Sequence, residues 1–542
     1  MKQKKPTKDA RLEGYDPVPV PVLDSTIANT DILARITLTF LQTLSLSRLE
    51  ESWYALVRAW PILAARVRRT PCTPSGISYL IPQPSTLSAL ETRSRTTRKE
   101  AEKHLVLVDA SFRSISTYQP IVGKALNGSL SRTQISVGHA PARAEQDEMT
   151  CANACKTFKE LLEADQSFLT AQATRWADAT VVTIAFSHVA GDAFGIKSIF
   201  AGWADALRGQ VPAGLEGLGK DPYIEYAPPQ GKKAKDENGK QVGLGKGWKK
   251  FGFVETVRLI SNLLWDIKVK RPEKSIEQFY IYMPEEKVQQ LITQARQDLE
   301  QLAAAQDARN SSSEHGGHLE KQSTPPLDYT VSTFNILFAF LLQNIHAANP
   351  SPRKRSSVLT IINAKHRPPA GHSTSDYPSH QLWGGAFGVP LRPLSSGEYV
   401  NLPLGQIALH IRESLKEQID PENIRANIVS SLKHGLWKNP SGKVLFFAGP
   451  RDYWYGCTEW RSVRFNAIDF RGALEPGEKE TGGGEGNQVR PVAIGTHMEI
   501  PMTQRNRWVI FGDAGKGVWF SGGTTRKEVH NAKGFGRYEW VQ

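Results

Sequence analysis

The chain has little cysteine for its length and no cluster of metal-ligating residues. Its 542 residues include four cysteines, Cys72, Cys151, Cys155 and Cys457, which are too few for a disulfide framework. Cys151 and Cys155 could face each other across one helical turn, but no further ligands stand at a spacing that suits a metal ion. We therefore expect neither a disulfide scaffold nor a metal site.

Long apolar runs are also missing. No segment approaches the roughly 18 to 20 apolar residues of a membrane-spanning helix, so we expect no membrane span. The start, Met1-Lys2-Gln3-Lys4-Lys5, is basic, but no apolar segment follows it, which excludes a secretory signal. We expect a cytoplasmic protein that acts as a monomer.

Positive charge exceeds negative charge by 13 at pH 7, and an excess of this sign is common in proteins that bind nucleic acids. Here the basic residues are scattered or lie in segments such as Gly231-Lys232-Lys233-Ala234-Lys235, without the interleaved aromatic residues of a base-stacking surface. We therefore expect no nucleic-acid partner. A positive cleft would instead suit an anionic small molecule.

The length of the chain exceeds a single core and predicts more than one domain. Residues 1–14 are charged and are expected to be disordered, and the Gly/Lys/Pro-rich segment 227–250 is expected to be a crossover linker. The linker divides the chain into domains at 15–226 and 251–542. Strands and helices are interleaved in both domains, which predicts an α/β class with mixed sheets. Two polar segments of the second domain, 307–326 and 474–489, are expected to be flexible insertions.

The most informative motif is Ser187-His188-Val189-Ala190-Gly191-Asp192. It follows the apolar run 181–186, which predicts a buried strand, and it precedes the helical spacing of 196–207. Small residues in the turn allow a sharp bend and a close approach of a ligand. The pattern predicts a histidine presented in a cleft, with Asp192 fixing the turn by pairing with a cation.

A serine hydrolase does not fit this motif. Adjacent residues at the end of a strand point to opposite faces, so Ser187 cannot converge with His188 as a nucleophile. No Gly-x-Ser-x-Gly sequence occurs elsewhere in the chain.

A second motif lies towards the C-terminus, where Thr458-Glu459-Trp460 is followed nine residues after the tryptophan by Asp469-Phe470. Together with His-x-x-x-Asp at 188–192, this arrangement resembles the BAHD family of acyl-CoA-dependent acyltransferases. That family carries Thr-Ser-Trp and then Asp-Phe-Gly-Trp-Gly at the same interval. The present sequence departs from the second pattern with Arg471-Gly472-Ala473, so the resemblance leaves the course of this loop open.

Weaker similarities lie between the two motifs, and the resemblance spans roughly residues 16 to 525. The matching segments are 45–67, 332–339, Asn363-Ala364-Lys365-His366-Arg367 and Trp383-Gly384-Gly385-Ala386. Each is unspecific alone, but their order and spacing follow those of the family.

The resemblance implies two chloramphenicol-acetyltransferase-like domains with a channel between them. It also implies acyl-CoA as co-substrate, without a permanently bound cofactor, and a small-molecule alcohol or amine as acceptor. His188 would be the general base, because a free imidazole is largely neutral at pH 7 and can take a proton. Asp192 would pair with an arginine and hold the turn.

The remaining site residues are implied by the resemblance as well. The indole N–H of Trp460 would stabilise the oxyanion, and Thr458 would bind the acceptor hydroxyl. Lys365 and Arg367 would contact the phosphates of CoA, and Asp469 would anchor the loop of the second motif.

Two other interpretations stay open at this point. A condensation-type domain of a peptide-synthesising assembly line shares the fold and the His-x-x-x-Asp core, but it usually shows two adjacent histidines, where this chain has Ser187 before His188. A catalytically weak binding protein on the same fold would account for Arg471 and Ala473 in the second motif.

Overall fold

The computed structural model describes residues 13–99, 102–141, 143–152, 154–215, 217–221, 223–226, 243–312, 330–365, 367, 384–433, 443–475, 488–499, 505–512 and 517–541. The predicted disordered start, the linker and the two insertions lie largely outside this part of the chain. Residues 307–312 are described, and they continue helix α10 (Glu285–Ser312) rather than beginning a flexible insertion.

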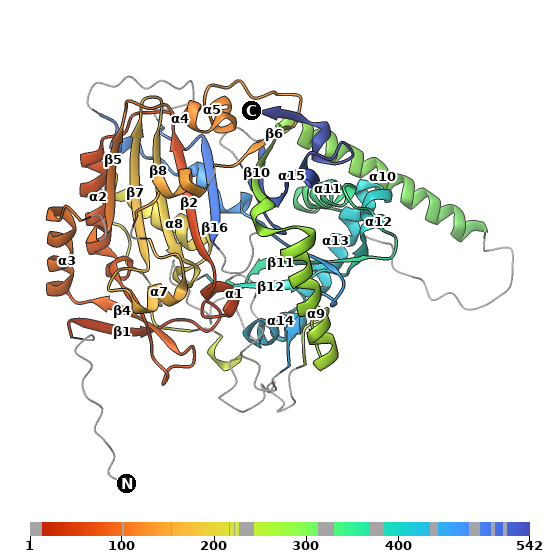
Figure 1. Ribbon diagram of the computed structural model, residues 1–542, viewed down its shortest axis with the longest axis horizontal. Helices are drawn as coiled ribbons and strands as arrows, with labels where there is room; N and C mark the ends of the chain where they lie inside the picture. The colour runs from red at the N-terminus through yellow and green to blue at the C-terminus, as the bar shows by residue number, and fades with distance from the viewer. Residues whose placement is uncertain are drawn as a thin grey trace, which may run out of the picture.

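A five-stranded sheet forms the first half of the molecule, in the order β16-β2-β8-β7-β5 (Figure 1). Its members are β2 (Leu33–Phe40), β5 (Leu105–Ala110), β7 (Leu169–Trp176), β8 (Thr180–Ser187) and β16 (Ala493–Glu499). Strand β5 is parallel to β7 and the other pairs are antiparallel. Strand β8 is buried at every position, as its apolar run predicts.

Helices α2 (Leu46–Ala59) and α8 (Ala193–Leu207) pack together in the core of this half. The rings of Trp53 and Trp203 lie 4.6 Å apart between their centroids, and both side chains are fully buried. A three-stranded sheet, β1 (Tyr15–Pro19), β4 (Ile77–Pro82) and β3 (Arg66–Arg69), and helix α3 (Pro84–Thr96) complete this side. Helix α8 begins where the motif at 187–192 ends, so the fold fixes the motif between a central strand and a core helix.

A nine-stranded sheet forms the second half, in the order β12-β11-β15-β17-β18-β10-β6-β19, with β13 paired to β11. Its members are β6 (Ser136–His139), β10 (Ile276–Met283), β11 (Arg355–Asn363), β12 (Ala386–Pro390), β13 (Leu394–Ser395), β15 (Tyr453–Glu459), β17 (Arg507–Gly512), β18 (Val518–Thr525) and β19 (Glu539–Val541). The sheet is mixed, since β11, β15 and β17 are parallel neighbours. Helices α10, α11 (Thr333–Ala347) and α13 (Leu404–Gln418) pack against one another beside it.

The remaining elements are short or peripheral. They are α1 (Ile27–Thr30), α4 (Ile115–Tyr118), α5 (Pro120–Leu126), α6 (Arg143–Glu148), α7 (Phe158–Glu163), α9 (Phe253–Trp265), α12 (Ser396–Asn401), α14 (Pro421–Lys433), α15 (Arg526–Val529) and the strand pair β9 (Lys249–Lys250) and β14 (Leu445–Phe446).

Each half contributes one strand to the sheet of the other. Strand β16 comes from the C-terminal part of the chain and pairs with β2, whereas β6 comes from the N-terminal part and pairs with β10 (Figure 1). The two sheets are therefore interlocked. A division of the chain at 227–250 stays a prediction, and it does not by itself separate the two sheets.

Candidate active site

A cavity of about 2090 Å³ is lined by residues from both halves of the molecule. Six of the seven predicted site residues line it, and they come from distant parts of the chain: His188, Asp192, Lys365, Arg367, Thr458 and Trp460. The seventh, Asp469, does not line this cavity.

His188 begins a 3₁₀ turn, His188–Ala190, directly after β8. Its backbone N–H donates to the carbonyl of Ile32 at 3.0 Å, which fixes the start of the turn. Gly191 has a φ of 145°, a backbone conformation that favours glycine. The turn therefore needs the small residue that the sequence places there.

The ring of His188 is held neutral. Burial lowers its pKa to about 4, although its own backbone carbonyl favours the protonated form. The Nδ1 atom is buried and has no hydrogen-bond partner within the described chain, and no described residue binds Nε2 either. Since the half-exposed side chain lines the cavity, Nε2 is the ring nitrogen that a ligand can reach.

Asp192 is the N-cap of α8. Its Oδ1 accepts the backbone N–H groups of Phe194 at 3.0 Å and Gly195 at 3.1 Å, and its Oδ2 accepts the amide of Asn363 at 2.5 Å. The prediction that Asp192 pairs with an arginine is wrong within the described part of the chain. The cation that acts on Asp192 there is Lys365. The carboxylate joins the end of the catalytic turn to the end of β11.

Asp24 is a second buried carboxyl group in this cluster, and no sequence motif pointed to it. It accepts the backbone N–H groups of Gly384 at 3.2 Å and Gly385 at 3.1 Å. Burial and the nearby charge of Asp192 raise the pKa of Asp24 to about 8. Burial lowers the pKa of Lys365, against the opposing charges of Asp192 and Asp24. Burial raises the pKa of Asp192 as well, so two desolvated carboxyl groups lie beside the one ammonium group of Lys365.

Trp460 follows β15 at the point where that strand ends beside β17. Its backbone N–H donates to the carbonyl of Ile510 at 2.7 Å, and its side chain is 8% exposed. No acceptor for its indole N–H occurs in the part of the chain that the structure describes. Thr458, two residues earlier on the strand, lines the same cavity. The geometry leaves both polar groups available to a ligand.

The loop at 469–473, whose sequence differs from the second motif of the family, is held by Asp469. Asp469 accepts the backbone N–H groups of Arg471 at 3.0 Å and Val489 at 2.9 Å, and it forms an ion pair with the guanidinium of Arg471 at 2.5 Å. Arg471 begins a 3₁₀ turn and does not adopt a positive φ. Neither residue lines the cavity, so this loop supports the fold, with Phe470 stacked on Phe40 in the core.

A group of cations that the sequence did not single out also lines the cavity. The ammonium groups of Lys354 and Lys270 lie 3.6 and 5.4 Å from the centroid of the Tyr453 ring, and Arg353, Arg355 and Arg451 line the same cavity. Burial, followed by the charge of Lys270, lowers the pKa of Lys354 to about 8. These cations make this part of the cavity positive, which suits an anionic ligand.

The described residues contain neither a membrane-spanning helix nor a cluster of metal ligands. None of their helices is both long and apolar enough to cross a membrane. No group of three or more His, Cys, Asp or Glu side chains among them is arranged to hold a metal ion.

Comparison with known proteins gives close relatives of one kind. The chain is 56% identical over 536 residues to acetyltransferase MAT1 of Pseudozyma antarctica (strain T-34), covering 98% of this chain and 99% of the relative. It is equally similar, 56% over 543 residues with the same coverage, to acetyltransferase MATC1 of Mycosarcoma maydis. No family profile matches the chain.

The fold is similar to that of TRI101 from F. graminearum, solved in complex with coenzyme A and deoxynivalenol. The two structures superpose with a TM-score of 0.61 at 12% identity, over 96% of this chain and 99% of the other. This similarity establishes a two-domain, chloramphenicol-acetyltransferase-like fold, as the sequence predicted.

Proposed function

Since this chain belongs to the BAHD-type family of acyl-CoA-dependent acyltransferases and is itself an acyltransferase, we propose that it acylates a hydroxyl group of a small specialised metabolite. An amine acceptor is the alternative that the same chemistry allows. The names of the two close relatives favour an acetyl group as the one transferred. The observation that carries the proposal is the neutral His188, whose ring lines one cavity together with Thr458 and Trp460.

His188 acts as the general base in this mechanism. Nε2 takes the proton of the acceptor hydroxyl as that oxygen attacks the thioester carbonyl. The indole N–H of Trp460 donates to the resulting oxyanion, and the hydroxyl of Thr458 holds the acceptor. When the tetrahedral intermediate collapses, the carbon–sulfur bond breaks and the CoA thiolate receives the proton from the imidazolium. The ester is released and His188 is neutral again.

Two other nucleophiles near the site are unsuited to a covalent intermediate. Ser187 is 1% exposed and does not line the cavity. Cys457 does line it, but burial and the charge of Glu459 raise the pKa of its thiol well above the ordinary value. Neither is an activated nucleophile, which supports direct transfer from CoA to the acceptor.

CoA is the co-substrate, and its phosphates require cations. Lys365 and Arg367 stay the predicted contacts, but Lys365 lies beside the Asp24 and Asp192 carboxyl groups, which act on its charge. The charges of Asp266 and Asp452 act on Lys354 in the same way, but neither Lys354 nor Lys270 forms an ion pair with a described carboxylate, and both line the same cavity. We therefore assign the phosphates to the Lys354 group as well as to Arg367.

A donor without phosphates separates these assignments. The KM for acetyl-CoA and for acetyl-pantetheine should be compared in Lys354→Gln, in Arg367→Gln and in the parent protein. Substitution of a residue that contacts phosphate should raise the KM for acetyl-CoA only. A substitution that raises neither KM, or raises both equally, would show that the residue does not contact phosphate.

The reaction itself is tested by incubating the purified protein with acetyl-CoA and a panel of alcohols and amines, with a thiol reagent to detect free CoA. Thiol release that depends on the acceptor, with an acetyl ester found by mass spectrometry, is expected. His188→Ala should abolish both, whereas His410→Ala, a matched change outside the cavity, should not. Acetylated protein accumulating without acceptor would contradict direct transfer. Monomeric state and cytoplasmic location stay predictions.

A further inference from the structure

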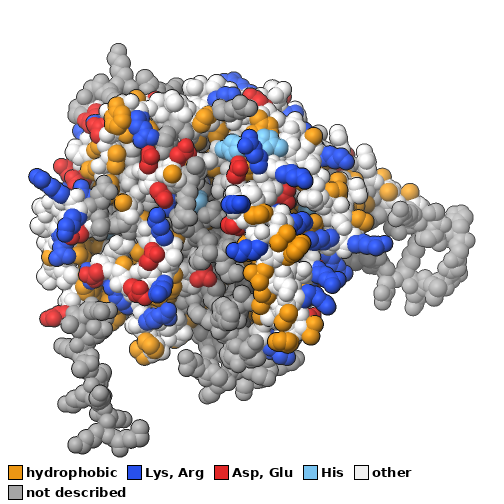
Figure 2. Space-filling view, viewed as in Figure 1, with side chains coloured by type: hydrophobic (Ala, Val, Ile, Leu, Met, Phe, Trp, Pro, Cys, Tyr) orange, Lys and Arg blue, Asp and Glu red, His pale blue; other side chains and the backbone are white. Residues whose placement is uncertain are grey.

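Helix α9 carries an apolar stripe on its outer side that is largely exposed. Phe253, Val257, Ile260 and Leu264 recur at the spacing of one helical face, and their exposed fractions lie between 40 and 83%. None of the residues of this helix is buried. Figure 2 shows hydrophobic side chains gathered over the position of α9, with Lys and Arg beside them. A contiguous apolar patch on a surface marks an interaction site.

A neighbouring side of α9 faces the cavity, and the two sides meet at Ile260. Leu259 and Leu263 line the cavity wall, and Ile260 and Trp265 both line it and are exposed. The helix therefore forms part of the cavity rim. A surface that covers the outer stripe would therefore lie beside the rim of the cavity.

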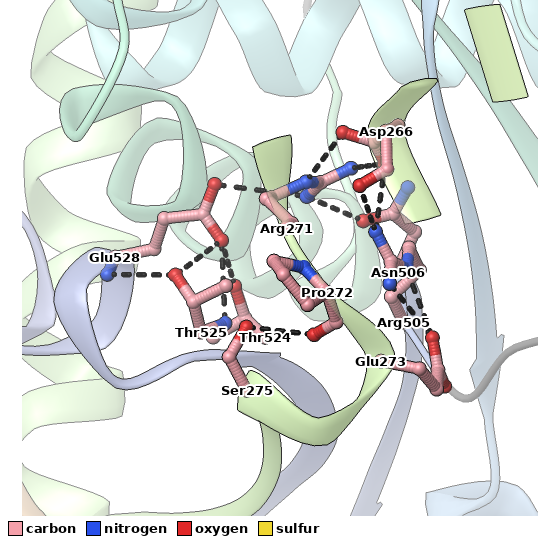
Figure 3. Close-up of polar contacts among 10 residues, drawn as sticks. All are labelled: Asp266, Arg271, Pro272, Glu273, Ser275, Arg505, Asn506, Thr524, Thr525 and Glu528. Atoms are coloured by element: carbon pink, nitrogen blue, oxygen red, sulfur yellow. Dashed lines mark hydrogen bonds and ion pairs between the residues drawn. The ribbon is translucent and has the colours of Figure 1, made fainter. Parts of the chain in front are cut away.

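The C-terminal end of α9 is firmly held, as Figure 3 shows. Asp266, the residue after the helix, accepts two hydrogen bonds from Arg271, at 3.0 and 2.6 Å, and pairs with Arg505 at 2.9 Å. Arg505 is fully buried and also binds Glu273 at 2.7 Å, and Arg271 donates to Asn506 at 3.1 Å. This network ties the helix to the start of β17, so the exposed stripe is a fixed feature of the fold.

Most charges around the stripe are positive, and the exposed carboxylate of the helix, Glu255, accepts the backbone N–H of Gly252 at 3.1 Å. Lys250, Arg258, Lys268 and Lys274 are exposed, and none of them forms an ion pair with a described residue. The carboxylates of Asp266 and Glu273 are bound to arginines inside the network. An apolar face flanked by free cations is complementary to an anionic lipid surface. A second copy of the chain on the same stripe would bring like charges together.

We propose that α9 docks the protein on an anionic phospholipid surface. The helix lies in the plane of the headgroups, with Phe253, Val257, Ile260 and Leu264 inserted at the acyl-chain boundary and the neighbouring cations against the headgroups. The cavity rim then faces the lipid. This inference does not rest on the proposed transfer reaction.

Binding to vesicles tests the proposal without any measurement of activity. The full chain is sedimented with two kinds of vesicle, one of phosphatidylcholine alone and one of phosphatidylcholine mixed with phosphatidylserine. Phe253→Glu/Leu264→Glu should lower the partition coefficient on phosphatidylserine vesicles at least tenfold. The matched control is Phe112→Glu/Val211→Glu, which changes side chains that are 83 and 88% exposed elsewhere and should leave binding within twofold of the parent. Lys268→Glu should weaken binding more than Lys159→Glu.

Three outcomes would overturn the proposal. The parent protein fails to bind phosphatidylserine vesicles, or it binds vesicles of phosphatidylcholine alone equally well. The third outcome is that the parent protein sediments as a dimer, and that among the variants only Phe253→Glu/Leu264→Glu is a monomer. Thermal unfolding of each variant is the control for folding, and the substitutions should leave the melting temperature close to that of the parent, because the positions are exposed.

Discussion

His188 and Asp192 lie at the two ends of one short turn, and their surroundings give them different tasks. The His188 ring faces the cavity and is uncharged at neutral pH. Both oxygens of Asp192 are bound by groups of the fold, including Asn363 from the other half of the molecule. In the proposed mechanism Asp192 is therefore a positioning residue, which holds the turn in place while His188 contacts the substrate.

The pH dependence of transfer should report the environment of His188. Only the neutral imidazole has a lone pair for the acceptor proton, and its pKa lies at about 4. We expect kcat/KM to be constant near neutral pH and to fall as the pH is lowered through about 4. Circular dichroism at each pH separates this loss from unfolding. An inflection near the ordinary histidine value of about 6.5 would show that the ring is not desolvated.

Removal of Asp192 should affect stability less than the loss of an isolated buried ion. Asp192→Ala removes a helix cap worth about 1 kcal/mol and a charged hydrogen bond to Asn363. When the charge of Asp192 is gone, the pKa of Asp24 falls, because that charge helps to raise it. Burial still raises this pKa, so Asp24 should ionise in a larger fraction of molecules, and its charge then replaces part of the charge of Asp192 beside Lys365. We expect a loss of about 2 kcal/mol in the free energy of unfolding, with loss of transfer activity.

A double-mutant cycle with urea unfolding tests this compensation. Asp24→Asn alone should cost little, since the group is largely protonated at neutral pH. The double variant Asp24→Asn/Asp192→Ala should lose more stability than the two single variants together. Additive losses would contradict an exchange of charge between the two carboxyl groups.

The sequence was informative for residues whose local context carries the signal. His188 could be found because a buried strand, a turn of small residues and a helix follow one another along the chain. Asp24, Asn363 and Lys354 act through contacts between segments that are remote in sequence. Such contacts leave no local pattern, so these residues and the correct partner of Asp192 required the structure.

At the scale of elements, the strands and helices around the motif were predicted well because their apolar spacing is strong. Strand β8 and helix α8 lie where the apolar run 181–186 and the helical spacing of 196–207 indicated. Helix α10 extends to Ser312, six residues into the segment 307–326 that was expected to be a flexible insertion. The sequence of these six residues is mostly polar and has no apolar periodicity, so it could not be distinguished from an insertion.

The turn at 471–473 makes a close contact that predicts an effect of Gly472. A Cβ atom at Gly472 would lie 2.2 Å from the carbonyl oxygen of Leu207 in α8, and a backbone atom in a core helix cannot move aside freely. Gly472→Ala should therefore lower the free energy of unfolding by about 1 to 3 kcal/mol. Gly214→Ala is the matched control, because nothing lies within 4 Å of its Cβ. Equal stability of the two variants would show that the turn adapts.

At the scale of the whole molecule, exchanged strands join the two halves, and both halves line the same cavity. Strand β16 pairs with β2 over seven residues, from Ala493 opposite Thr39 to Glu499 opposite Leu33. Strand β6 pairs with both β10 and β19. The two domains and the channel between them were expected from the sequence. The exchange of strands was not, because the partner of a strand is set by tertiary packing.

The exchange predicts that neither half folds alone. A fragment ending at residue 226 lacks β16, so β2 becomes an open edge, and its own β6 has no partner. A fragment starting at residue 243 lacks β6, which leaves edges on β10 and β19. Unpaired edges promote aggregation, so each fragment expressed alone should be insoluble or unfold without a cooperative transition. The two fragments expressed together should form a soluble complex that releases CoA in the presence of acceptor. A sharp thermal transition for either fragment alone would show that the exchanged strands are dispensable.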